Sequence, residues 1–224
     1  SQLIEGLNVA DLAWGTANAK TVTLSFQVYS SLTGTFGGAL QNSAQNRSYP
    51  FTYTISSANT WQYQTITIAG DTTGSWYSNN GIGMYVIYNF GAGSGYTASS
   101  GNSWQAAYYQ TVTGAVQPQQ YANGSFYLTG VQLEKGTQAT SFDWRSIDTE
   151  TRMCMRYFQK YQINNSETQG YWGAMLGNGY SSTLFQMLYN ANPPLRDTPT
   201  ISSSGTFNVI QGNSLSGSVT IAGD

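Results

Sequence analysis

Apolar and polar side chains alternate with a period of two along much of the chain. Three segments show this pattern most clearly, at 21–28 (TVTLSFQV), 49–55 (YPFTYTI) and 82–90 (IGMYVIYNF). In the first of them every second residue from Val22 to Val28 is apolar. Successive side chains of a strand point to opposite faces of its sheet, so the pattern predicts half-buried antiparallel strands.

Two further segments, 61–68 and 125–133, change the phase of this alternation midway. In the second, the apolar set moves by one position at Gly130. A shift at a glycine predicts a β-bulge, which is common in curved sheets. No segment has a sustained helical period, and residues 148–153 fit at most one helical turn.

The character of the chain changes near residues 143–152. Long strands and glycine-rich loops precede this region, whereas shorter strand-like segments such as 153–161 (MCMRYFQKY) follow it. Strands joined by long loops favour a two-sheet sandwich of jelly-roll type over an up-and-down barrel. We therefore expect an all-β protein with three parts: a jelly-roll β-sandwich at 1–143, a hinge at 144–152 and a smaller C-terminal β domain at 153–224.

Charged residues form only 8% of the chain, against roughly 25% in an ordinary soluble domain. The net charge of −2 and the lack of a basic tract argue against a nucleic-acid partner. The longest apolar-rich run has about half the length that a membrane-spanning helix needs, so we expect no membrane insertion. Amides, hydroxyls and 14% aromatic residues replace the missing charge. Such a surface suits hydrogen bonding to neutral polar matter, and glycans are the obvious candidate.

The sequence contains no histidine, which excludes Ser-His-Asp triads, Cys-His dyads and the usual zinc sites. Its one cysteine, Cys154, precludes an intrachain disulfide and is expected to be a small buried apolar residue. A glycosidase needs two carboxylates that flank the bond it cleaves. Glu134 and Asp143 have basic neighbours, and Asp71 lies in a turn-capping context, so we expect structural roles for them, no catalytic residues and no cofactor.

Residues 130–161 hold nine of the eighteen charged side chains, counting eight Lys and Arg with ten Asp and Glu. Acidic and basic residues alternate there, which favours ion pairs over an active site. We expect Arg145 and Arg152 to pair with nearby acids, namely Asp143, Asp148 or Glu150.

Three stretches, at 4–40, 47–76 and 126–161, resemble a module of bacteriophage tail fibre and tail tip receptor-binding proteins. In that family a carbohydrate-binding-module-like jelly roll is followed by a hinge of the form G-V-Q-L-E-x-G-x-x-A-T-x-F-[ED]-x-R. The segment from Gly130 to Arg145 matches this hinge. A C-x-R-Y-[YF] strand follows it in the family, and residues 154–158 match that motif.

The resemblance implies a virion-associated, extracellular adhesin that is a homotrimer and continues an upstream fibre shaft. Its partner would be a bacterial surface polysaccharide or lipopolysaccharide glycan. Jelly rolls of this kind often carry a structural calcium beside an Asp pair on the last long strand, but Thr129 and Gly130 stand at that place. With Glu5 and Glu134 as the only candidate ligands, we expect no metal. The alternatives are a purely structural trimerisation or spacer module and, less favoured, a polysaccharide depolymerase.

Glycan recognition rests on aromatic rings, which pack on the C–H face of a sugar, and on neighbouring amides and hydroxyls. The candidates, from loops and outward strand positions, are Trp76, Tyr77, Tyr85, Tyr96, Tyr108 and Tyr109. Three more positions are expected to face outward beside Tyr85, namely Gln62, Gln64 and Tyr127. The competing interpretation is that each aromatic residue caps the sandwich core or packs at a trimer interface. For Trp104 the core is the preferred expectation.

Overall fold

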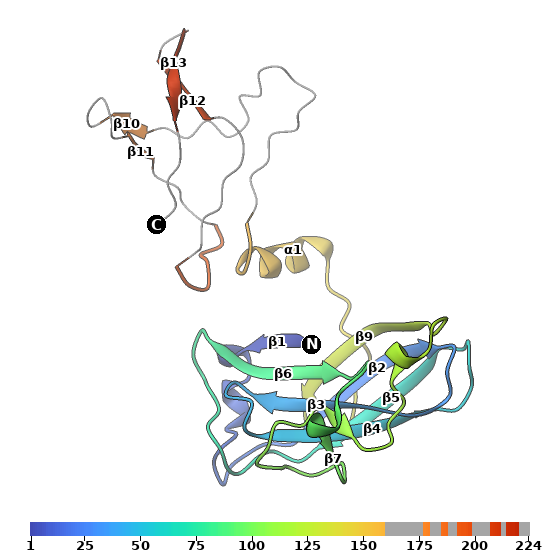
Figure 1. The fold of residues 1–224 in the computed structure, drawn as a ribbon. Coiled ribbons are helices and arrows are strands. Elements are labelled where there is room, and N and C mark those ends of the chain that lie inside the picture. The colour runs from blue at the N-terminus through green and yellow to red at the C-terminus, as the bar shows by residue number, and fades with distance from the viewer. Residues whose placement is uncertain (160–176, 180–184, 188–191, 199–206, 212–213, 220–224) are drawn as a thin grey trace. The chain divides into compact units, whose positions relative to one another are not determined.

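The computed structural model describes residues 1–159, 177–179, 185–187, 192–198, 207–211 and 214–219 (Figure 1). The chain divides into two compact units, Ser1–Trp144 and Arg145–Asp224. Most of the described regular structure is β-sheet, which confirms the all-β class, and one α-helix accompanies it in the described part. No helix among the described residues has the length and apolar character to cross a membrane.

The first unit contains two antiparallel sheets. The four-stranded sheet has the order β1 (Gln2–Glu5), β6 (Ile82–Tyr88), β3 (Gly34–Asn42) and β4 (Ser48–Ile55). The three-stranded sheet has the order β5 (Gln62–Ile68), β2 (Val22–Ser30) and β9 (Phe126–Lys135). Short elements complete the unit: β7 (Thr97–Ala98), β8 (Thr111–Val112), and the 3-10 helices η1 (Gly6–Asn8), η2 (Ala10–Leu12), η3 (Ser94–Tyr96) and η4 (Pro118–Gln120).

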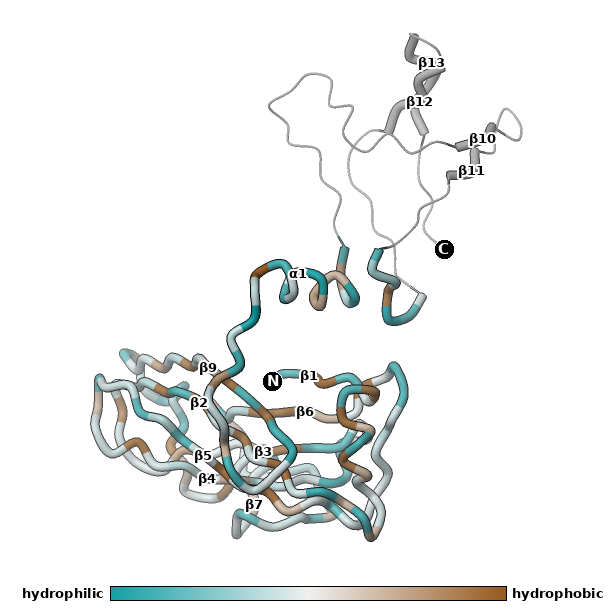
Figure 2. Tube along the Cα trace, turned by 180° about the vertical axis from the view of Figure 1, so that it is seen from behind, coloured by the Kyte–Doolittle hydropathy of each residue, from teal (hydrophilic) through white to brown (hydrophobic). Residues whose placement is uncertain are grey.

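The core lies between the inner faces of these two sheets. The apolar residues that alternate along β2, from Val22 to Val28, are all buried, as are the alternating aromatic residues of β4. The Phe26 ring of β2 contacts Tyr53 of β4 and Tyr88 of β6 edge to face, with 5.1 Å between centroids in each case. Brown, hydrophobic positions recur along the strands in Figure 2. Each large apolar side chain buried in this way contributes roughly 1.5–3 kcal/mol.

The predicted bulge at Gly130 is confirmed. The pairing of β2 with β9 shifts register between Ser25 and Gln27, and Gly130 has φ +58°. A residue with a side chain adopts this left-handed conformation only at a cost, so glycine is the natural occupant. The extra residue changes which side of β9 faces the core.

The phase change along β5 has a different cause, because its pairing with β2 is continuous. Ile66 and Ile68 face the core, and Trp61 and Tyr63 lie on the outer side, where each is about half exposed. The glutamines of this segment follow the inward positions: Gln64 Nε2 donates to the Thr54 carbonyl at 2.9 Å, and Gln62 accepts from Ser56 at 3.0 Å. The expectation that Gln62 and Gln64 face outward beside Tyr85 is therefore wrong.

Residues 89–117 cover much of the outer face of the four-stranded sheet. Gln41 Nε2 donates to the Tyr109 carbonyl at 2.7 Å, and Ser48 Oγ donates to the Ala107 carbonyl at 2.7 Å. Gly37 leaves no room for a side chain, because a Cβ there would lie 2.1 Å from Thr111 Oγ1. Polar residues of β3 and β4 are consequently buried on the face opposite the core.

In the second unit, residues Ile147–Met155 form the helix α1. Ser146 is its N-cap and accepts a hydrogen bond from the Thr149 amide, and two acidic residues lie in the first turn. Both features stabilise a helix start. The helix corrects the expectation of at most one turn at 148–153, and it extends into the segment 153–161 that was predicted to be a strand.

The remaining described elements of the second unit are two hairpins. β10 (Gly177–Gly179) pairs with β11 (Phe185–Met187), and β12 (Phe207–Gln211) pairs with β13 (Ser214–Val219), both antiparallel. The rest of the predicted C-terminal β domain lies largely outside the described residues. Cys154 is a free, exposed thiol on α1, so the expectation of a buried position was wrong.

Candidate functional site

A pocket of about 300 Å³ lies against the outer side of β6. Residues from β6, from the turn after it and from the segment 89–117 that covers the sheet surround this pocket. The residues that line it are Ser1, Gln45, Tyr85, Ile87, Tyr88, Asn89, Phe90, Gly91, Tyr108, Gln110 and Gln119. We call it the Tyr85 pocket. Its volume is at the small end of the range for ligand sites, which suits one or two sugar units rather than a long chain.

The floor of the Tyr85 pocket follows from the alternation along β6. Met84 and Val86 face the core, so Tyr85 and Ile87 necessarily face the outer side. Both outward residues are partly exposed. The strand that supplies the core thus also supplies the floor.

The wall of the pocket is held by a small aromatic and amide cluster. The rings of Tyr96 and Tyr108 meet edge to face with centroids 5.3 Å apart. Gln110 Nε2 donates to Tyr108 Oη at 2.8 Å, and the Gln110 amide donates to the Tyr96 carbonyl at 2.8 Å. These contacts fix the Tyr108 ring before any ligand arrives.

Asn89 lines the pocket, and its side-chain nitrogen, Nδ2, has no hydrogen-bond partner in the described structure. Asn89 is only 4% exposed, and its backbone amide is already used by the Gly37 carbonyl at 2.9 Å. The Tyr88 hydroxyl also lacks a partner, but its ring packs with Phe26 on the core side of β6, where burial raises the pKa of Tyr88. A buried polar group without a partner costs about 1–3 kcal/mol. A ligand hydroxyl that reached the enclosed Asn89 nitrogen would remove that cost.

None of the described residues that line the Tyr85 pocket carries a charged side chain. Apart from Ser1, its polar side chains are amides and phenols, which donate and accept hydrogen bonds without carrying a charge. The arrangement therefore suits a neutral, hydroxyl-bearing ligand.

Two of the candidates from the sequence, Tyr85 and Tyr108, meet in this pocket. Tyr96 and Tyr109 are not among the lining residues: Tyr96 packs edge to face on Tyr108, and the Tyr109 carbonyl accepts a hydrogen bond from Gln41. Sequence patterns missed Asn89, Gln110 and Gln119, because isolated loop amides in an amide-rich chain give no signal.

Trp76 is placed in a different environment. Its ring meets Trp14 and Trp104 edge to face at 4.7 and 5.4 Å, and all three pack with the core. Trp104 donates to the Ala69 carbonyl at 2.7 Å, so its expected core position is confirmed. Tyr77 is 50% exposed beside the turn at Gly81 and is not among the residues of the Tyr85 pocket.

Asp71 forms a two-point ion pair with Arg47. Arg47 Nη2 lies 2.6 Å from Asp71 Oδ1, and Arg47 Nε lies 2.9 Å from Oδ2. Asp71 also accepts from the Thr73 amide at 3.2 Å, which confirms the predicted turn-capping role. Burial alone would raise the pKa of Asp71, but these hydrogen bonds and the Arg47 charge outweigh it and lower the pKa. Both oxygens of the Asp71 carboxylate therefore have structural partners within the fold.

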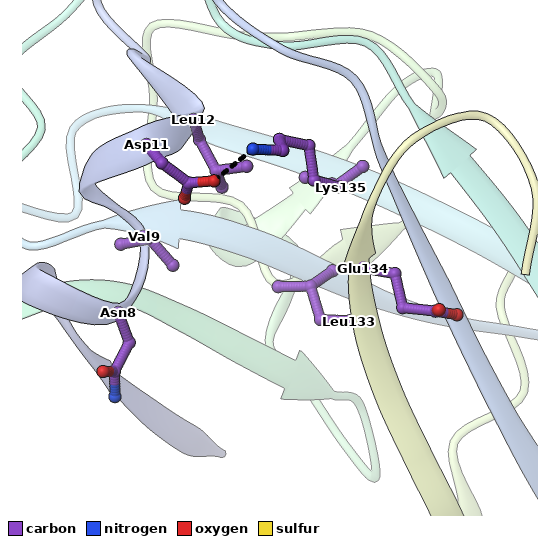
Figure 3. Close-up of a pocket in the computed structure, with 8 residues that line it drawn as sticks. Asn8, Val9, Asp11, Leu12, Leu133, Glu134 and Lys135 are labelled. Carbon is purple, nitrogen blue, oxygen red and sulfur yellow. Dashed lines mark hydrogen bonds and ion pairs between the residues drawn. The ribbon is translucent and has the colours of Figure 1, made fainter. Parts of the chain in front are cut away.

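A second pocket, of about 230 Å³, lies between η1, η2 and the end of β9 (Figure 3). Asp11 and Lys135 point toward each other there and form an exposed ion pair at 2.5 Å. Glu134 points away from them in Figure 3 and binds the Thr140 amide at 3.0 Å. Hydrogen bonds from Thr140 and then Gln132 lower the Glu134 pKa. The two carboxylates thus serve different partners.

Among the described residues, no group of three or more Asp, Glu, Cys or His side chains is placed so that it could hold a metal ion. The predicted ion pairing in the charged segment is confirmed for Arg145, which lies 3.4 Å from Glu150. No protein-family model, no curated protein and no solved structure matches the chain.

Proposed function

We propose that the chain is a jelly-roll domain and C-terminal extension of a bacteriophage tail fibre adhesin. It attaches the virion to a bacterial surface polysaccharide or lipopolysaccharide glycan through the Tyr85 pocket, without catalysis. The observation that carries the proposal is a pocket without charged side chains that combines two tyrosine rings with the unpartnered side-chain nitrogen of Asn89. In the virion the domain is a homotrimer at the end of a fibre shaft and faces the extracellular medium.

A sugar ring in this pocket packs its C–H face on Tyr85 or Tyr108. Asn89 Nδ2 donates to one of its hydroxyls, and Gln110 and Gln119 offer further donors and acceptors. A single small site of this kind binds weakly, with about −4 kcal/mol at a millimolar Kd. Three copies in one fibre raise the avidity without any new contact.

Two features of the fold support the jelly-roll and non-catalytic parts of the proposal. The first is the pair of antiparallel sheets, in which the late strand β9 returns to lie beside the early strand β2. The second is the use of carboxylates: Asp11 and Asp71 are in ion pairs, and Glu134 caps Thr140. A glycosidase pair needs two carboxyl groups aimed at one bond.

The test is a glycan array that carries bacterial surface polysaccharides, probed with the full chain and with a Tyr85→Ala, Tyr108→Ala double variant. We expect the wild type to bind at least one glycan and the double variant to lose about tenfold or more in affinity. Tyr77→Ala is the control, since it removes an exposed tyrosine that lies outside the pocket. Circular dichroism confirms that each variant is folded.

Equal binding by the wild type and the double variant would overturn the assignment to the Tyr85 pocket. Absence of binding to every glycan, with intact assembly, would instead favour a structural spacer module. Release of reducing ends from a bound polysaccharide would overturn the non-catalytic assignment.

A further inference from the structure

The outer face of the three-stranded sheet is covered over only half its length. There the segment after β9 folds back on the sheet: Thr23 Oγ1 donates to the Gly136 carbonyl at 2.9 Å, and Thr67 Oγ1 to the Thr137 carbonyl at 3.3 Å. Gln132 Nε2 also reaches the Ser141 carbonyl at 3.3 Å. This half of the face is closed, and Ser25 within it is buried.

The other half of the face is open and carries a line of three aromatic rings, one from β2, one from β9 and one from the residue just before β5. The Tyr29 ring of β2 lies between Trp61, 5.7 Å away just before β5, and Tyr127 of β9, 5.5 Å away. Tyr29 and Tyr127 are direct partners across the two strands. Trp61 and Tyr127 are 49% and 57% exposed. We call Trp61, Tyr29 and Tyr127 the aromatic row.

The exposed faces of these three rings are not part of the hydrophobic core. The core is closed from the other side of the same strands, by residues such as Phe26 and Ile66. Large aromatic side chains gathered in the open on a sheet are unusual, and such patches commonly mark binding surfaces. The row is also continuous across the strands, which gives a ligand several ring contacts in succession.

The chemistry around the aromatic row indicates the kind of ligand. The Tyr29 hydroxyl donates to Asn59 Oδ1 at 3.3 Å, and Gln27, Tyr63 and Thr129 form the next line of residues across the strands. None of these residues is charged. Aromatic rings beside amides and hydroxyls, without ions, match the C–H faces and hydroxyls of a neutral sugar chain.

The angles between the rings indicate which form of polysaccharide fits the aromatic row. Trp61 is tilted by 54° and Tyr127 by 66° relative to Tyr29, so the three rings do not form a flat platform. A flat crystalline polysaccharide surface would need coplanar rings. A single flexible chain can present successive sugar faces at different angles and so follow the tilts.

We propose that the aromatic row is a second carbohydrate-binding site, which takes a single linear chain of uncharged sugars across β5, β2 and β9. It lies on the opposite outer face of the first unit from the Tyr85 pocket and is independent of the function proposed for that pocket. With both sites the domain holds a terminal sugar on one face and a polymer chain on the other.

The experiment measures binding of the full chain to three soluble polymers by affinity electrophoresis: dextran, hydroxyethyl cellulose and the acidic polymer alginate. The wild type is expected to bind at least one of the two neutral polymers and not to bind alginate. A Trp61→Ala, Tyr127→Ala variant should lose about tenfold or more in affinity, whereas Trp61→Phe, which keeps a ring, should retain most of it. The Tyr85→Ala, Tyr108→Ala variant should bind the polymers as the wild type does.

The proposal is overturned if the wild type binds neither neutral polymer, or if the row variant binds as well as the wild type. It is also overturned if sedimentation shows that the row variant loses oligomeric mass while polymer binding is unchanged, because the face is then an interface between copies. Loss of polymer binding in the pocket variant alone would assign the polymer to the Tyr85 pocket instead. The two double variants therefore separate a failure of this proposal from a failure of the pocket.

Discussion

Arg47 and Asp71 are joined by two short contacts, at 2.6 and 2.9 Å, across 24 positions of the sequence. Both side chains are largely withdrawn from water, since Asp71 is 2% and Arg47 is 16% exposed at the side chain. The same carboxylate accepts from the Trp76 indole at 3.3 Å. The pair thus connects the turn before β4, the loop after β5 and the tryptophan cluster.

Replacing Asp71 with Asn should destabilise the protein by about 3–5 kcal/mol, because it leaves Arg47 buried without its counter-charge. Urea unfolding followed by fluorescence measures the change. The matched control is Asp11→Asn, which removes a carboxylate from an exposed pair and should cost about 1 kcal/mol or less. Equal effects of the two substitutions would show that the Arg47–Asp71 pair does not stabilise the fold.

The same pair makes stability depend on pH in the acid range. The Asp71 pKa is lowered in the folded state, and in the unfolded chain it is about 3.9. Its contribution is therefore complete above the unfolded pKa and is lost as the pH falls through the folded pKa. Urea midpoints measured from pH 6 downward should fall more steeply for the wild type than for Asp71→Asn below about pH 4. Parallel curves would contradict the assignment.

The close approach of Gly37 to Thr111 predicts a link between the sheet and the covering loop. A Gly37→Ala substitution places a Cβ against Thr111 Oγ1 and should destabilise by about 1–3 kcal/mol. It should also weaken glycan binding, since Tyr108 is on the same loop. A Gly37→Ala, Thr111→Ala double variant removes that oxygen and should recover part of both losses, a coupling that a double-mutant cycle detects. Simple additivity would argue against this contact.

Glu134 is predicted to hold the segment after β9 rather than a ligand. Its carboxylate accepts from the amide and the hydroxyl of Thr140, and both hydrogen bonds are lost in Glu134→Ala. Hydrogen exchange should become faster at the Thr140 amide and its neighbours, while glycan binding remains at the wild-type level. Asp148→Ala, an acidic residue outside this contact, is the control. A fall in glycan affinity without a change in exchange would assign Glu134 to a binding site.

Much of the first unit could be predicted from period-two alternation. β2 and β4 bury one apolar face each, as the pattern requires, and Gly130 marks a real bulge. These features are local, because one buried face and one backbone angle decide them. The all-β class follows from the same signal.

Two features of the structure differ from the sequence-based expectations for reasons that the alternation of apolar residues does not show. The helix α1 forms where the apolar period is weak, because Ser146 caps it and acidic residues occupy its first turn. Trp61 and Tyr63 are large and apolar, yet they face outward, since their strand positions alternate with the inward Gln64 and Ile66. Size alone therefore does not tell which face of a strand is buried.

The candidate site was predictable only in part. Tyr85 faces outward because its neighbours on β6 face the core, and that much is visible in the sequence. The meeting of Tyr85 with Tyr108 depends on how residues 89–117 cross the sheet, which is decided by long-range contacts such as that of Gln41 with the Tyr109 carbonyl. The same fold places Trp76 against Trp14 and Trp104.

The most direct measurement for the Tyr85 pocket is a nuclear magnetic resonance titration of the full chain with the glycan that binds best on the array. The side-chain amide of Asn89 is the unpartnered donor, so its signals should shift with the same dissociation constant as those of Gln110 and Gln119. The side-chain amide of Gln64, bound to the Thr54 carbonyl on the core side, should not move. Saturable binding with no shift at Asn89 would contradict the proposed site.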